Sequence, residues 1–76
     1  MIEILVFGQL TDITASGSVI IPMTGSTEEL LDELYRAYPG LRGKTFLLSV
    51  DQQIVRENRP IHTDSKIALL PPFSGG

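Results

Sequence analysis

Residues 26–40, STEELLDELYRAYPG, contain the strongest structural signal in the chain, and they predict one amphipathic helix. Ser26 and Glu29 have the spacing of a capping box, in which each side chain accepts a hydrogen bond at the helix N-terminus. Apolar side chains then recur at helical spacing and form one stripe, made of Leu30, Leu31, Leu34 and Tyr38 with Tyr35 and Ala37 on its flanks. Pro39 disfavours helical geometry at Tyr38, so we expect the helix to end there.

Strand-forming segments lie on both sides of this helix. Two precede it and three follow it, at residues 2–8, 18–23, 44–50, 52–55 and 65–70. One mixed sheet that packs on the single helix satisfies this ββαβββ order. The predicted fold class is therefore α+β, a ubiquitin-like β-grasp of about five strands on one main helix. We expect a domain at residues 1–70 and a flexible, extended tail at residues 71–76.

Alternation along the first and last strands predicts which side chains face the helix. The even-numbered residues of the first strand, from Ile2 to Val6, would face it and leave Leu5 and Phe7 on the opposite face. In the last strand, Leu69 would point inward and Leu70 outward. The sheet is thus predicted to have apolar side chains on both faces.

The outward apolar residues predict a docking surface. Several apolar side chains grouped on one exposed sheet face are typical of an interaction site, and here the group is Phe7, Ile54 and Leu70. The alternative is that residues 9–17, which are rich in turn formers, cover Leu5 or Phe7. The docking surface is the interpretation we carry forward.

Composition excludes several classes of function. The chain contains no cysteine, so we expect no disulfide or thiolate metal site, and a reducing, cytoplasmic environment. The six Lys and Arg residues are scattered and the net charge is −3, which argues against nucleic acid as a partner. Apolar runs are far shorter than the ~20 residues of a membrane span, and the basic region of a signal peptide is absent. We therefore expect neither a membrane anchor nor export.

Side chains that perform catalysis are scarce. The one histidine, His62, lies in a turn-rich stretch without a second ligand beside it that would complete a metal site. The acidic pairs Glu28–Glu29 and Asp32–Glu33 point in different directions around the helix, which argues against a carboxylate dyad. We predict no bound cofactor, no metal and no catalytic machinery in this chain alone.

Residues 71–76, PPFSGG, indicate a different kind of chemistry. Pro71 and Pro72 favour an extended, stiff conformation that leads the chain away from the sheet. Six residues reach up to about 20 Å, and Gly75 and Gly76, which lack Cβ atoms, can thread a narrow channel in another protein. The Gly76 carboxylate would be the reactive group, after adenylation with ATP by a partner enzyme and conversion to a thiocarboxylate. The alternative is a frayed end without function.

These segments together resemble the MoaD/ThiS group of ubiquitin-like sulfur carriers, and within it the MoaD-type small subunit of molybdopterin synthase. The resemblance covers nearly the whole chain, in the segments ILVFGQL (4–10), ELLDELYRAYPGL (29–41), SVDQQIV (49–55) and DSKIALLPPFSGG (64–76). Two prolines ahead of Gly-Gly are the most specific feature, because carriers of the thiamine pathway end in Gly-Gly but usually lack them.

The resemblance implies a cycle with three partner proteins. An E1-like enzyme would use ATP to adenylate Gly76, a sulfurtransferase would supply sulfur, and the large subunit of molybdopterin synthase would receive the tail. There the Gly76 thiocarboxylate would donate sulfur to a cyclic pyranopterin monophosphate. The resemblance also assigns docking to Phe7, Ile54 and Leu70. The residues that it implies thread into a partner are Pro71, Pro72, Phe73, Ser74 and Gly75.

Two further functions fit the same residues. In the first, the chain carries sulfur for thiamine synthesis or tRNA thiolation, or acts as a protein modifier that is joined to lysines. In the second it is a non-catalytic interaction module whose tail has no role. Deletion of Gly75 and Gly76 would then leave function untouched.

Overall fold

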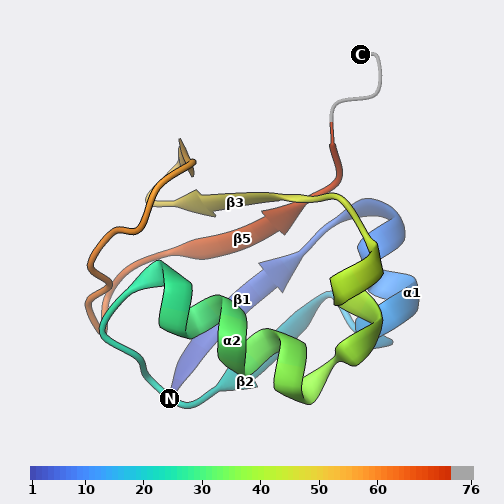
Figure 1. Ribbon diagram of the computed structural model, residues 1–76, viewed down its shortest axis with the longest axis horizontal. Coiled ribbons are helices and arrows are strands. Elements are labelled where there is room, and N and C mark those ends of the chain that lie inside the picture. Colours follow the sequence, from blue (N-terminus) through green and yellow to red (C-terminus); the bar gives the residue numbers. More distant parts are fainter. Residues whose placement is uncertain (73–76) are drawn as a thin grey trace.

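The computed structural model describes residues 1–72, which form one mixed sheet and one main helix (Figure 1). The elements, with η for a 3-10 helix, are β1 (Ile2–Val6), η1 (Gly8–Leu10), α1 (Thr11–Thr14), β2 (Ser18–Ile21), α2 (Thr27–Ala37), η2 (Pro39–Gly43), β3 (Leu47–Val50), β4 (Gln53–Val55) and β5 (Ile67–Leu70). The predicted ββαβββ order is present, and short helical turns are added after β1 and after α2.

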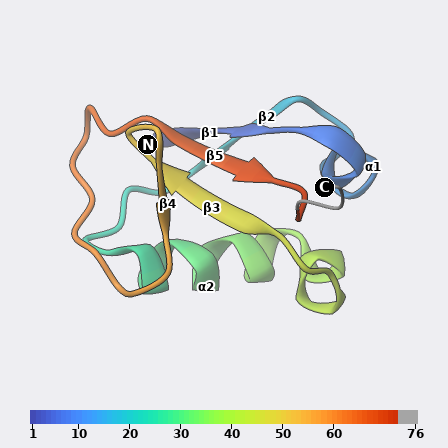
Figure 2. The same ribbon diagram turned by 90° about the horizontal axis from the view of Figure 1, so that it is seen from above.

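The five strands form one sheet in the order β2–β1–β5–β3–β4. The central pair, β1 and β5, is parallel, and the other pairs are antiparallel. Figure 2 shows α2 along one side of this sheet. A main helix on a mixed sheet whose first and last strands lie side by side in the centre is the ubiquitin-like β-grasp, so the predicted fold class is confirmed.

Helix α2 begins where the capping signal predicts. The Ser26 hydroxyl accepts a hydrogen bond from Glu29 N (3.4 Å), and the Glu29 carboxylate accepts one from Gly25 N (3.0 Å). A further cap comes from far along the chain, because Asn58 Oδ1 accepts a hydrogen bond from Glu28 N (2.9 Å). These side chains satisfy backbone donors that have no partner inside the helix.

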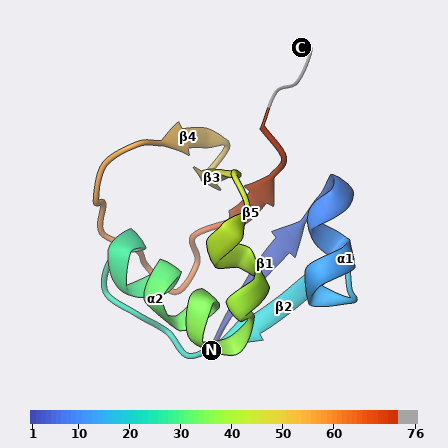
Figure 3. The ribbon, with the colours of Figure 1, turned by 45° about the vertical axis from the view of Figure 1, so that its right-hand side comes forward.

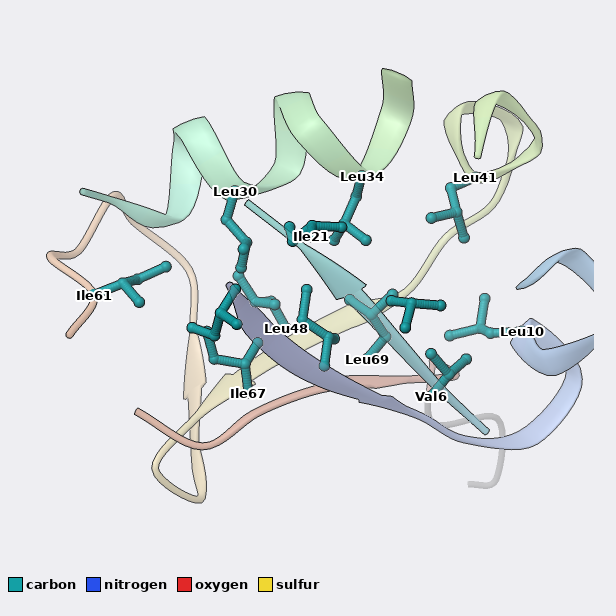
Figure 4. Packing of buried hydrophobic residues seen from close by; sticks show 13 residues of the cluster. Val6, Leu10, Ile21, Leu30, Leu34, Leu41, Leu48, Ile61, Ile67 and Leu69 are labelled. Carbon is teal, nitrogen blue, oxygen red and sulfur yellow. The ribbon is translucent and has the colours of Figure 1, made fainter. Parts of the chain in front are cut away.

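The hydrophobic core lies between α2 and the inner face of the sheet (Figure 4). Leu30 and Leu34 are fully buried and point from α2 toward the sheet. Leu10 of η1 and Leu41 of η2 are also buried and close one end of the core. Each buried leucine contributes roughly 1.5–3 kcal/mol, so the predicted leucine stripe holds α2 on the sheet.

Residues 9–17, which are rich in turn formers, contain helical turns in the structure. They contain most of η1 and all of α1, and they bury Leu10 and Thr14. The chain turns helical here because Leu10 reaches the core, and burial of its side chain compensates for ordering a very short helix that would not form alone.

All five strands are shorter than predicted. β1 ends at Val6 rather than at residue 8, and β4 begins at Gln53 rather than at residue 52. β3 begins at Leu47 rather than at residue 44, because η2 extends to Gly43 and Lys44 N still donates to Leu41 O (3.1 Å). β2 ends at Ile21, directly before Pro22, and β5 begins at Ile67 rather than at residue 65. Helix α2 likewise ends at Ala37, one residue before the predicted end.

Candidate functional site

The parallel pairing of β1 and β5 brings the ends of both strands to the same edge of the sheet. β5 ends at Leu70, and Phe7 N, just beyond the end of β1, donates a hydrogen bond to Leu69 O (3.1 Å). After Leu70, Pro71 is half-buried and Pro72 is exposed. Figures 1 and 3 show the chain leaving the end of β5 on the side away from α2. The start of the tail therefore lies next to the end of β1.

Apolar side chains line the outer face of the sheet, which is the face opposite α2. Leu5 and Phe7 are 46% and 45% exposed, and Ile54 on β4 is 39% exposed. Ala68 and Leu70 of β5 lie between them and are half-buried. We call these five residues the outer apolar face. Grouped apolar surface of this kind is typical of a protein–protein contact.

Strand register shows how the outer apolar face is arranged. Leu5 pairs with Ala68 across the central strands. Ala68 pairs with Ser49, and Ser49 pairs with Ile54. Adjacent strands lie ~4.8 Å apart, so Leu5 and Ile54 are separated by about 14 Å. The face thus has small side chains in its middle and larger apolar side chains on both sides.

The outward orientation predicted for Leu5 and Phe7 is confirmed, and the alternative that residues 9–17 cover them is wrong. That segment buries Leu10 in the core instead. Leu70 is half-buried, so it offers less surface than Phe7 does. The docking roles of Phe7, Ile54 and Leu70 stay predictions, because exposure alone does not identify a partner.

Sequence reasoning missed one exposed apolar residue on this side of the sheet, outside the outer apolar face. Ile20 of β2 is 63% exposed and pairs with Glu3 near the start of β1. Its neighbours Val19 and Ile21 are buried. The alternation that placed Leu5 outward would have found it, since residues 18–21 follow the same period of two.

Residues 1–72 offer little for catalysis or metal binding. They contain no group of three or more His, Cys, Asp or Glu that could hold a metal ion. His62 is exposed, as predicted for a surface residue. None of the helices in this range is long and apolar enough to cross a membrane.

Three hollows in the described part of the chain border residues of the site. One, of about 270 Å³, is lined by Leu5 together with the start of β1 and residues 63–67, and the other two differ in size. The smaller has a volume of about 290 Å³ and is lined by Pro71 and Pro72 at the start of the tail and by Leu10 and Ile13 of the helical turns after β1, among others. The larger, of about 520 Å³, lies between α2 and the segment of β3 and β4. Of these two, the hollow of about 290 Å³ is the one lined by Pro71 and Pro72, so its walls surround the first two residues after β5.

The remaining tail residues lie outside the described part of the chain. They are Phe73, Ser74, Gly75 and Gly76, and the carboxylate that is predicted to react belongs to the last of them. Their predicted roles, and the predicted threading of Pro71 and Pro72 into a partner, stay predictions. The same holds for the boundary between a domain at residues 1–70 and a tail at 71–76.

Comparison with known sequences gives two matches that cover the chain almost completely. The profile of the ThiS family matches residues 4–76. The molybdopterin synthase sulfur carrier subunit of Dictyostelium discoideum is 31% identical over 81 residues, and the match covers 97% of this chain and 94% of that protein.

Two solved structures from Haloferax volcanii have a similar fold. SAMP1 superposes with a TM-score of 0.81 at 23% sequence identity, over 99% of this chain and 98% of that one. A second structure, of small archaeal modifier protein 1, gives a TM-score of 0.79 at 20% identity, over 93% of this chain and 95% of that one. At these identities the likeness concerns the fold.

Proposed function

Since the chain belongs to the ThiS family of ubiquitin-like sulfur carriers, we propose that it carries sulfur for the synthesis of molybdopterin. Gly76 is the proposed carrier residue, and its thiocarboxylate donates sulfur to a pterin precursor in the large subunit of molybdopterin synthase. The 31% identity to a molybdopterin synthase sulfur carrier subunit over 97% of the chain supports this choice of pathway. The proposed partners are that large subunit, an E1-like enzyme and a sulfurtransferase.

The first proposed step activates a poor electrophile. A carboxylate resists attack because its charge is delocalised, so its oxygen first attacks ATP on the E1-like enzyme, giving an acyl adenylate and pyrophosphate. A sulfur nucleophile at the oxidation level of sulfide then displaces AMP, which breaks a C–O bond and forms a C–S bond. The thiocarboxylate sulfur then forms a bond to a carbon of the pterin precursor in place of an oxygen leaving group. Water cleaves the remaining C–S bond to Gly76, which leaves the sulfur on the precursor and restores the carboxylate. Because these steps consume ATP, the proposed location of the protein is the cytoplasm.

One geometric observation supports a carrier of this kind: the outer apolar face ends beside the point where the chain leaves β5. Leu5 and Phe7 are exposed on β1 and just after it, and Pro71 follows the neighbouring strand. A partner that covers the face would therefore have the tail entering next to the contact. Binding energy from the non-reacting face then holds the reacting carboxylate in place.

Intact-mass measurement tests the proposal. The protein is incubated with an E1-like enzyme, ATP and a sulfur donor, and the expected product is heavier by one sulfur in place of one oxygen. Addition of the large subunit and the pterin precursor should return the original mass. A sample without ATP and a variant that lacks Gly76 are the controls. If no E1-like enzyme from the same organism produces the mass gain, the proposal is wrong.

A second candidate rests on the ThiS family match over residues 4–76, which does not by itself name molybdopterin synthesis as the pathway. In it, the same thiocarboxylate supplies thiamine synthesis or tRNA thiolation, or the Gly76 carboxyl group is joined to lysines of other proteins. Sulfur delivery to a thiazole synthase, or recovery of lysine conjugates from cells, favours this candidate. Delivery to molybdopterin synthase alone excludes it.

A further inference from the structure

Gly8, the first residue of η1, lies two residues after the end of β1 and against Pro71, the first residue after β5. Its φ angle is +65°, in the left-handed region that L side chains rarely adopt. A Cβ atom placed on Gly8 would lie 2.8 Å from Pro71 Cγ and 3.3 Å from Pro71 Cδ. Two independent observations, backbone angle and close approach, therefore require glycine at this position.

The backbone around Gly8 is held on several sides. Phe7 N donates to Leu69 O of β5 (3.1 Å) and Val6 N donates to Gly17 O (2.8 Å). The Gly8 carbonyl accepts a hydrogen bond from Thr11 Oγ1 (2.9 Å). Because strand and helical turn both fix this peptide, the Pro71 ring rests on a well-ordered surface.

We propose that Gly8 is a positioning residue for the sulfur-carrier reaction: its missing Cβ lets the Pro71 ring lie on the end of β1, and this contact sets the direction in which the tail leaves the sheet. The inference rests on the proposed function, in which the outer apolar face docks while the carboxylate reacts elsewhere. Pro71 is the link between the two, since it directly follows Leu70 of that face.

A side chain at Gly8 moves Pro71 and leaves the rest of the domain in place. The ring has to retreat by at least about 0.6 Å to bring its Cγ from 2.8 Å to an ordinary contact of 3.4 Å. Pro71 is half-buried and borders the hollow of about 290 Å³, so it has room to retreat. The tail begins at Pro71, so a shift of this ring moves the point from which the tail enters the partner, and a displacement of about 1 Å at a reacting group can cost up to about 100-fold in rate.

Steady-state kinetics of thiocarboxylate formation, followed by intact mass at varied carrier concentration, tests the proposal. We expect Gly8→Ala to lower kcat by roughly ten- to 100-fold and to change KM less than about threefold, because the outer apolar face is intact. Gly8→Asn should behave alike, since Asn tolerates the φ angle but keeps the Cβ. The matched control is Gly17→Ala, where an added Cβ meets nothing within 4 Å.

A double variant separates the contact from general strain. Pro71→Ala removes Cγ and Cδ, and the remaining Pro71 Cβ lies 3.5 Å from the added atom, an ordinary contact. Relative to Pro71→Ala alone, Gly8→Ala should then slow kcat by less than about threefold. In the free wild-type protein, a nuclear Overhauser effect between the Gly8 Hα atoms and the Pro71 ring should be present.

Four results would overturn the inference. The first is a wild-type kcat for thiocarboxylate formation on the Gly8→Ala carrier. The second is a loss of kcat in Gly8→Ala that Pro71→Ala does not relieve. The third is a rise in KM with kcat unchanged, which would mean that Gly8 serves docking. The fourth is absence of the Overhauser effect, which would refute the contact itself. A wild-type chain that gains no sulfur at all refutes the proposed function instead, and the role of Gly8 with it.

Discussion

Replacement of Phe7 by alanine tests whether the outer apolar face docks the activating enzyme. An exposed fraction of 45% corresponds to about 90 Å² of a side chain that buries roughly 200 Å² when fully covered. At ~25 cal/mol per Å², complete burial against a partner contributes about 2 kcal/mol. Loss of that contact raises Kd by about 30-fold.

The part of the Phe7 side chain that is already buried contributes to folding, so the effect of the substitution on stability has to be separated from its effect on Kd. By the same area argument, truncation lowers the free energy of unfolding by about 1–2 kcal/mol after allowance for residual structure in the unfolded chain. A domain of this size is stable by roughly 4–11 kcal/mol, so the variant stays folded at 25 °C. Urea unfolding followed by circular dichroism measures this loss.

Calorimetric titration of carrier into the E1-like enzyme gives the Kd values. Ile20→Ala is the matched control, because Ile20 is 63% exposed on the same face but pairs with Glu3, near the other end of β1 from the tail. We expect it to change Kd by less than about threefold, since its surface is distant from the tail entry. The reasoning is refuted if Phe7→Ala binds as tightly as wild type, or if both variants lose affinity equally.

Three other predictions follow from single contacts. Asn58→Ala removes the acceptor for Glu28 N and should lower the free energy of unfolding by about 1–2 kcal/mol, or roughly 4–16 °C in Tm. Asn58→Asp keeps the acceptor and should melt close to wild type, so equal losses in both variants would contradict the capping role. Gln52→Gly should stabilise the protein by about 1 kcal/mol, because Gln52 in the β3–β4 turn has φ +70°, an angle that costs L residues roughly that amount. A lower urea concentration at the unfolding midpoint would show that the Gln52 side chain has another role. Deletion of Gly75 and Gly76 should abolish the sulfur gain by mass and leave Kd for the E1-like enzyme within about threefold of wild type, since docking depends on the outer apolar face; unchanged sulfur gain would assign the reaction to another group.

Local sequence signals account for α2 and for the two faces of the central strands. Ser26 and Glu29 cap the helix and Leu30 and Leu34 are buried, because side-chain spacing along a helix or strand sets which residues share a face. The same rule placed Leu5 and Phe7 outward. This rule concerns only neighbours within one element and gives no information on where the element begins. The predicted starts of β3 and β5 were therefore too early.

Contacts between distant segments had no signal that a single sequence could supply. Asn58 caps α2 from about thirty residues away, and Leu10 draws residues 9–14 into helical turns. Gly8 was one glycine among seven, and nothing local distinguished it from Gly17, which has open space around it.

The amino-acid sequence alone thus predicts the β-grasp class, which follows from the ββαβββ order of the elements. It also predicts the buried stripe of α2 and the apolar character of the outer face, since these depend on the periodicity of single elements. The order of strands and the contact between Pro71 and Gly8 arise only in the folded sheet, where the parallel pairing of β1 and β5 brings the ends of these two strands to the same edge. Such a contact depends on where two backbones pass each other in space, and the residue types along either one do not record it.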